Sequence, residues 1–221
     1  ISIPLSTGAG IYLAEYSKKG RLTNFIRTCI EILSSLPSVV VGLFGYLIFV
    51  VQFEYGFSIL SGALALTVFN LPQMTRNVED SLRHVHHTQR EAGLALGISR
   101  WETVLHVVIP EALPGIVTGI VLASGRTFGE AAALIYTAGQ SAPALDWSNW
   151  NPFSVTSPIS IFRQAETLAV HLWKVNSEGT IPDGTLVSAG SAAVLLIFIL
   201  IFNLAARRIG KVLHRKLTSA Q

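Results

Sequence analysis

The chain has 221 residues, of which 50% are hydrophobic and only 13% are charged. Soluble domains carry about 25% charged residues, so this composition excludes a disordered, coiled-coil or collagen-like chain and indicates a polytopic membrane protein. The net charge of +3 is not gathered into a basic stripe outside the last fifteen residues, which argues against a nucleic-acid partner. The single cysteine, Cys29, excludes a disulfide scaffold and a cysteine metal cage within the chain.

Apolar stretches of about 20 residues are expected to form membrane-crossing helices, because that length of helix spans the hydrocarbon core of a bilayer. In chain order the sequence predicts a partial first span at 1–16 and full spans at about 29–53, 57–74, 107–136 and 185–206. The stretch 1–16 begins without Met, and we interpret it as the end of a helix truncated on its N-terminal side. The expected fold class is all-α, a transmembrane helix bundle over residues 1–206.

The positions of Lys and Arg between these spans predict the orientation of the chain. Thirteen of the sixteen Lys and Arg residues lie in the connections 17–28 and 75–106 and in the tail 207–221. The connection 137–184 holds two, and one lies inside a span. Since cytoplasmic loops carry the excess of positive charge, the basic loops and the C-terminus are expected in the cytoplasm and 137–184 outside.

The connection 75–106 is too long for a simple turn between helices, where about 2–8 residues suffice. Residues 89–96 are strong helix formers, and Gly97 follows them as a helix stop. Ser99 and Glu102 have the spacing of a capping box, which predicts that a second helix begins directly after Ser99. Two short helices around a glycine bend make a compact knob that suits insertion into a cleft on another protein.

Two charged residues, Arg126 and Glu130, lie inside the apolar stretch 107–136, where each costs about 2.5–3.5 kcal/mol at a helix centre. Residues four apart share one face of a helix and can pair. One interpretation is a neutralised pair that holds two helices together. The other is an anion passage, because a guanidinium offers a planar fork to oxyanions such as phosphate.

Two G-x-x-x-G spacings lie in the same stretch, Gly115 with Gly119 and Gly125 with Gly129. Small residues at this spacing let membrane helices approach closely. Close approach around a buried charge is typical of the wall of a narrow passage, which favours the second interpretation.

The sequence from Glu91 onward resembles the E-A-A-x3-G-x9-I-x-L-P motif of ABC importer permeases, with Glu91, Ala92, Gly93, Gly97 and Pro110 at the matching spacing. The departures, Gly93 for Ala among them, are small or conservative. In that family this loop docks onto a cytoplasmic ATPase subunit and transmits its movement, so the resemblance implies an ATPase-coupling role for the five residues. The chain contains no G-x-x-x-x-G-K-[ST] motif. ATP hydrolysis is therefore expected on a partner subunit, and the chain itself is not expected to be an enzyme.

The segment 125–132, G-R-T-F-G-E-A-A, is similar to the G-R-A-x-G-E-T-A stretch of phosphate ABC permeases, and segments 3–16 and 36–45 match further stretches. The resemblance covers nearly the whole chain and is best for the A-type subunit (PstA) of the MetI-like importer permeases. It implies a subunit of an inorganic phosphate importer in the bacterial inner membrane, with Arg126 and Glu130 in the substrate pathway. The implied partners are a second permease of C type, ABC ATPase subunits, an extracellular phosphate-binding protein and membrane lipid. No cofactor is expected.

Other functions stay open at this point. A permease for another oxyanion, sulfate or molybdate, would share most of these features. A proton- or sodium-coupled secondary transporter would use Arg126 and Glu130 as a relay, but it would work without an ATPase and leaves the knob unexplained. A non-transporting membrane anchor or sensor comes third. No metal site is expected at His84, His86 and His87, because no carboxylate or thiolate accompanies them at ligand spacing.

Overall fold

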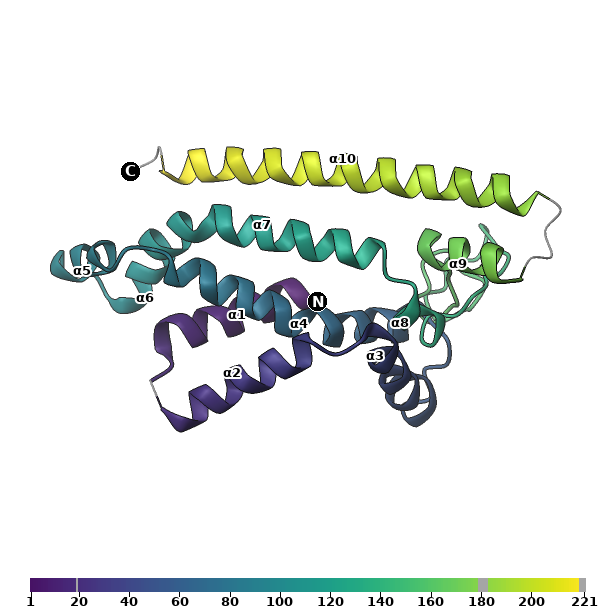
Figure 1. Ribbon diagram of the computed structural model, residues 1–221, viewed down its shortest axis with the longest axis horizontal. Coiled ribbons are helices and arrows are strands. Elements are labelled where there is room, and N and C mark those ends of the chain that lie inside the picture. Colours follow the sequence, from purple (N-terminus) through teal and green to yellow (C-terminus); the bar gives the residue numbers. More distant parts are fainter. Residues whose placement is uncertain (19, 179–182, 219–221) are drawn as a thin grey trace. The chain divides into compact units, whose positions relative to one another are not determined.

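The computed structural model describes residues 1–18, 20–178 and 183–218 (Figure 1). All regular secondary structure in these ranges is helical, which confirms the predicted all-α class. Lys19, residues 179–182 of the expected outer loop and the last three residues of the expected tail lie outside the described residues. The helices in chain order are α1 (Ser2–Ile11), η1 (Tyr12–Tyr16, a π-helical turn), α2 (Arg21–Ser34), α3 (Ser38–Gly45), η2 (Tyr46–Gln52, π-helical), α4 (Ile59–Arg83), α5 (His87–Ala95), α6 (Arg100–Thr103), η3 (Val104–Val108, π-helical), α7 (Ile109–Phe128), α8 (Ala132–Ile135), α9 (Leu168–Glu178) and α10 (Gly184–Thr218).

The chain divides into two compact units, each with its own buried apolar residues. The first unit comprises Ile1–Ser34, Asn70–Gly125 and Ile201–Gln221. The second unit comprises Ser35–Phe69 and Arg126–Leu200. The knob predicted in the connection 75–106 belongs entirely to the first unit, whereas Arg126 and Glu130 belong to the second.

The core of the first unit explains why α4 is longer than its apolar stretch. The sequence predicts a span that ends near residue 74, but the helix continues to Arg83. Val78 and Leu82 are buried one turn apart on this polar extension, where they pack with Val108 and Ala112. Burial of this apolar face stabilises the helical conformation of α4 beyond the apolar stretch that ends near residue 74.

Glycines on α7 allow it to approach α4 closely in the first unit. A Cβ added at Gly115 would lie 2.7 Å from Ser81 Oγ, and one at Gly119 would lie 3.0 Å from Asn77 Cβ. These distances confirm the predicted close approach at the first G-x-x-x-G pair. At Gly125 a Cβ would meet no described atom within 4 Å, so within the described residues this position makes no such approach.

The second unit is built around small residues and a long irregular segment. Gly42 on α3 packs against Ala133, whose Cα would lie 2.7 Å from an added Cβ. The segment between α8 and α9 returns to the start of α4, where the carbonyls of Ile161 and Arg163 accept hydrogen bonds from the backbone N–H groups of Leu60 and Ile59, each 2.9 Å long. These carbonyls satisfy donors that a helix N-terminus leaves without partners of its own.

By length and hydropathy, two helices of the described chain can cross a membrane: the continuous helix Arg100–Phe128 and the stretch Gly184–Val212 of α10. The pair α2 and α3–η2 forms a third candidate if it is counted as one bent span. The predicted single helix over 29–53 is therefore wrong in its continuity. Pro37 precedes α3 and has an extended conformation (ψ 138°). Proline has no N–H to continue a helix, and it disfavours helical geometry in the residue before it, so the helix breaks here.

Helix α10 also exceeds its predicted range of 185–206 and carries the basic tail as helix up to Thr218. The apolar side chains along α10 are exposed, among them Leu186, Leu196 and Ile201. Because lipid is as apolar as these side chains, exposure of this kind is normal for a helix that faces a bilayer.

Candidate functional site

The knob (residues 87–103) consists of α5, a glycine turn and α6. Helix α5 ends at Ala95, and Gly97 follows with φ +80°, a conformation that favours glycine. The Ser99 hydroxyl accepts a hydrogen bond from the Glu102 backbone N–H (3.3 Å), and the Glu102 carboxylate accepts one from the Ser99 N–H (2.8 Å). The predicted helix, glycine stop and capping box are all confirmed.

Gly93 sets the distance between the two helices of the knob. It is buried on α5, and a Cβ there would lie 2.8 Å from Cγ2 of Thr103 on α6. Thr103 is itself fixed, since its hydroxyl donates to the Ser99 carbonyl (3.0 Å). Glycine in place of alanine thus allows the contact that makes the knob compact.

Three of the five predicted coupling residues, Ala92, Gly93 and Pro110, line one hollow of about 290 Å³ between the knob and the start of α7. Gln89 also lines it, and its amide oxygen is buried without a hydrogen bond from any described residue. Glu91 is exposed on the helix surface, where its carboxylate lies 3.1 Å from Nδ1 of His87. Gly97 forms the turn between α5 and α6 and does not line the hollow.

The tip of the knob is apolar and exposed. Leu94 is 50% exposed, Leu96 82% and Trp101 56%. Large apolar side chains that cluster on a protruding helix pair are typical of a protein contact surface.

A buried ion pair holds the base of the knob. Arg90 on α5 donates to the Glu15 carboxylate with a shortest distance of 2.7 Å, and the same guanidinium donates to the carbonyls of Leu82 (2.7 Å) and Val85 (2.6 Å). Arg100 donates to the Glu15 carbonyl. Glu15 is 6% exposed and lies in the π-helical turn after α1, so the pair ties the knob to the first helix of the chain.

The sequence predicts no role of their own for Glu15 and Arg90. The usable signal was Glu15 itself, an acidic residue within the apolar stretch 1–16, because such a residue requires a partner when it is buried. Nothing local indicates that this partner is 75 residues away.

Arg126 and Glu130 do not lie on one helical face, so this part of the prediction is wrong. Helix α7 ends at Phe128, and Glu130 lies in the turn that follows. The buried Glu130 carboxylate accepts a hydrogen bond from the Ala133 N–H (3.1 Å) at the start of α8. The Arg126 guanidinium lies over the ring of Phe69, 4.2 Å from its centroid.

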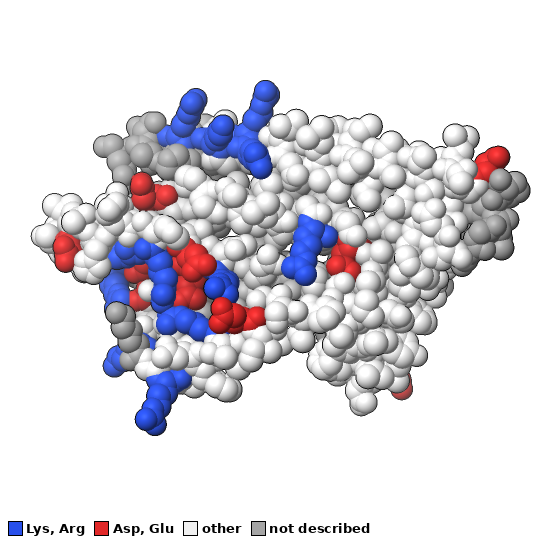
Figure 2. Space-filling view, viewed as in Figure 1, with Lys and Arg blue, Asp and Glu red and all other residues white. Residues whose placement is uncertain are grey.

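A second group of charges, which the sequence does not predict, joins α2 to α4. Glu79 is buried and accepts from Arg27 (2.9 Å) and Arg83 (3.0 Å), and the exposed Arg76 pairs with Glu31 (2.8 Å). These residues surround a hollow of about 220 Å³ that Asp80 also lines. Figure 2 shows charges of both signs intermixed in the region of α2 and α4. Three arginines opposite three carboxylates leave the hollow formally neutral.

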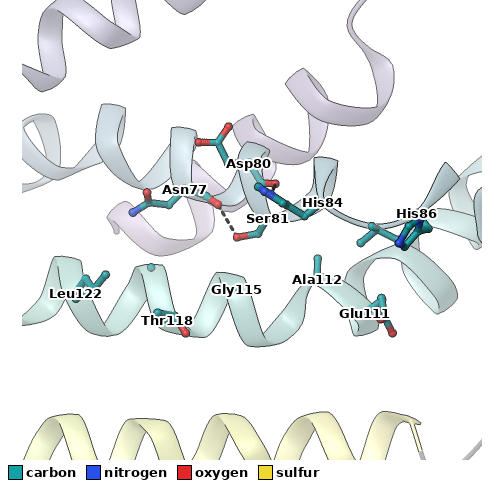
Figure 3. A pocket seen from close by; sticks show the side chains of 12 residues that line it. Asn77, Asp80, Ser81, His84, His86, Glu111, Ala112, Gly115, Thr118 and Leu122 are labelled. Atoms are coloured by element: carbon teal, nitrogen blue, oxygen red, sulfur yellow. Dashed lines mark hydrogen bonds between the residues drawn. The ribbon is translucent and has the colours of Figure 1, made fainter.

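A hollow of about 450 Å³ lies between α4 and α7 in the first unit (Figure 3). Asn77 and Ser81 line it from α4, and the Ser81 hydroxyl donates to the Asn77 carbonyl (2.7 Å). Asp80 and Glu111 lie on opposite walls. Two carboxylates make this hollow unfavourable for an anion, so size alone does not identify the substrate route.

A family model described as "binding-protein-dependent transport system inner membrane component" matches residues 6–219. The chain belongs to this family. It is accordingly a membrane-embedded permease subunit of an ABC importer, and the predicted MetI-like family is confirmed.

Several relatives of this permease carry transport names. The "probable ABC transporter permease protein YqgI" of Bacillus subtilis is 58% identical, over 99% of this chain and 74% of that protein. The "phosphate transport system permease protein PstA 2" of Mycobacterium bovis is 34% identical, over 96% of this chain and 66% of that protein. PstA of Xylella fastidiosa is 35% identical, over 94% of this chain and 67% of that protein.

Among solved structures, a chain of the MetNI methionine ABC transporter, described as inward facing, superposes with a TM-score of 0.71. The alignment covers 96% of this permease and 87% of that chain at 17% identity. This likeness establishes the fold.

Proposed function

We propose that the chain is the A-type permease subunit of an ATP-driven importer of inorganic phosphate. The observation that carries the proposal is the knob, in which a helix, a glycine turn and a capped second helix gather Ala92, Gly93 and Pro110 around one hollow. A separate ATPase subunit would insert its surface against this hollow and against the exposed Leu94, Leu96 and Trp101. Relatives named for phosphate transport support the choice of substrate.

Docking of the knob has a clear physical source of free energy. Fully burying a leucine side chain is worth about 1.5–3 kcal/mol, and the two exposed leucines together with Trp101 supply most of the apolar surface at the tip.

Movement of the knob would reach the membrane helices through two connections. The Arg90–Glu15 pair joins α5 to η1, and the capped α6 continues through η3 into α7. Closure of the ATPase subunits would pull both connections together, as alternating access requires.

In the substrate passage we assign Arg126 and Glu130 different tasks. The ring of Phe69 engages the face of the Arg126 guanidinium, while guanidinium donors point in its plane, which suits an oxyanion with three or four oxygens. Glu130 holds the start of α8 through its hydrogen bond to Ala133 and so shapes the wall next to Arg126.

The assembly that we propose contains a C-type permease, two ABC ATPase subunits and an extracellular phosphate-binding protein. The knob and the basic end of α10 would face the cytoplasm, in accordance with the positive-inside rule. The segment between α8 and α9 would face outward.

The test is transport by the assembled importer in vesicles that carry ATP on the ATPase side. We expect labelled phosphate to accumulate only with ATP, and excess sulfate or molybdate to leave the rate unchanged. Competition by either ion would identify another oxyanion as the substrate. Full transport without the ATPase would instead support a secondary transporter.

The variant Arg126→Ala separates the passage from the assembly. We expect it to abolish uptake while the complex still co-purifies with its ATPase. Normal uptake by this variant would refute the role of Arg126 in the passage.

A further inference from the structure

A groove of about 390 Å³ lies between α7 and the C-terminal part of α10, within the first unit. It is lined by Pro114, Val117, Thr118, Arg207, Gly210 and Lys211. The helices touch at Gly210, where an added Cβ would lie only 2.5 Å from Cγ1 of Val117. Next to this contact, the groove between the two helices is open to another molecule.

The charge of the groove has one sign. Arg207 and Lys211 are one helical turn apart on α10 and both are exposed, and no carboxylate is among the lining residues. The sequence of α10 contains no Asp or Glu, and Figure 2 shows Lys and Arg gathered on its C-terminal part. The hollow at Arg27, by contrast, balances its arginines with carboxylates.

The groove also lies where a membrane span ends. The apolar stretch of α10 that can cross a membrane runs to Val212, so Arg207 and Lys211 fall in its last turns. Ile209 and Val212 between and beyond them are 66% and 54% exposed, as side chains in contact with lipid are. Basic residues at the end of a span lie at the level of lipid headgroups, with apolar groove walls next to the acyl chains.

We propose that this groove binds the headgroup phosphate of an anionic phospholipid, with Arg207 and Lys211 as its cations and Pro114, Val117 and Gly210 against the upper part of an acyl chain. A lipid fits better than free phosphate, because half of the groove is apolar and opens where the bilayer surrounds the helices. The site is separate from the knob and from Arg126, and it requires only that the chain is a membrane permease.

The test is native mass spectrometry of the assembled importer, titrated with phosphatidylglycerol or with phosphatidylcholine. We expect preferential retention of phosphatidylglycerol. Arg207→Gln and Lys211→Gln each remove a cation that contacts the lipid phosphate in the groove, so each should weaken binding roughly fivefold and the double variant roughly 25-fold. Phosphatidylcholine binding should not change.

Arg208→Gln is the matched control, because it removes the same charge from the next position along α10, and Arg208 does not line the groove. It should leave binding unchanged, and the exchange Arg207→Lys with Lys211→Arg should retain it. The same spectra report the mass of the intact complex, so a variant that fails to assemble is recognised. If the double variant does not assemble, lipid binding by the two single variants tests the proposal.

Three outcomes would overturn the proposal. The first is phosphatidylglycerol binding by the double variant as strong as that of the parent. The second is a loss in Arg208→Gln as large as that in Arg207→Gln. The third is displacement of the lipid by inorganic phosphate alone, with the same dependence on Arg207 and Lys211, which would make the groove a free-anion site.

Discussion

Two arginine–carboxylate pairs in the first unit have almost the same length but different surroundings. Arg90 lies 2.7 Å from Glu15, and Arg76 lies 2.8 Å from Glu31. The side chains of the first pair are 18% and 6% exposed, and those of the second 51% and 63%. Arg90 also satisfies two backbone carbonyls, so it is one part of a network, whereas water competes for both partners of the Arg76 pair. The distance between the charges therefore says little about their importance; burial and additional acceptors decide it.

The largest effect is expected for Arg90→Ala. The substitution leaves the Glu15 carboxylate buried without its partner and removes the donor of two carbonyls, which costs about 3–5 kcal/mol. Denaturant-induced unfolding of the purified permease in micelles would measure the loss. Arg76→Ala in the same assay is the matched control, and equal losses for both variants would contradict the comparison.

Glu79→Gln is expected to have an intermediate effect. Glu79 is buried but its partners Arg27 and Arg83 are partly exposed, so water can solvate them after the charge is removed. Loss of hydrogen bonds to a charged group costs about 1.5–3 kcal/mol. The same unfolding assay applies, and a loss as large as that of Arg90→Ala would show that partner exposure is unimportant here.

At the turn of the knob, Gly97→Val is expected to cost about 1–2 kcal/mol, because a branched residue disfavours φ near +80°. A stronger effect is expected on coupling: ATPase activity of the assembled importer should continue while uptake falls. Gly97→Asn tolerates this backbone conformation better and should retain coupling. An unchanged ratio of uptake to hydrolysis in Gly97→Val would show that the turn does not transmit movement.

The smallest effect is expected for the exposed pair. Arg76→Ala should change the free energy of unfolding by about 0–1 kcal/mol, and the difference should shrink as salt rises. Unfolding at low and at high ionic strength tests this. A salt-independent loss would indicate that the Arg76 pair is less accessible to water than its exposure suggests.

The elements of the knob could be predicted because their signals are local. Helix α5 follows from a run of eight neighbouring residues, Gly97 from its place directly after that run, and the capping box from Ser99 and Glu102, three positions apart. The same kind of reasoning predicted the close approach at Gly115 and Gly119, since the spacing of small residues is itself the cause.

Other features depend on contacts that spacing does not reveal. The helix boundary after Phe128 separates Arg126 from Glu130, although an apolar run continues through both. The extension of α4 depends on burial of Leu82 by residues from α7. Arg90, which pairs with Glu15, and Arg27, one of the two partners of Glu79, come from distant parts of the chain. A single sequence reports that such charges need partners but not which ones.

The start of α4 is held by two main-chain oxygens, those of Ile161 and Arg163, in addition to the hydroxyl of Ser58, which accepts from the Ser61 N–H (3.2 Å). Any amino acid supplies a carbonyl, so substitutions at these two positions should preserve the helix start. A deletion in the preceding stretch, in contrast, would shift both oxygens at once. The segment that carries Ile161 and Arg163 can therefore vary in its side chains during evolution, but its length is constrained.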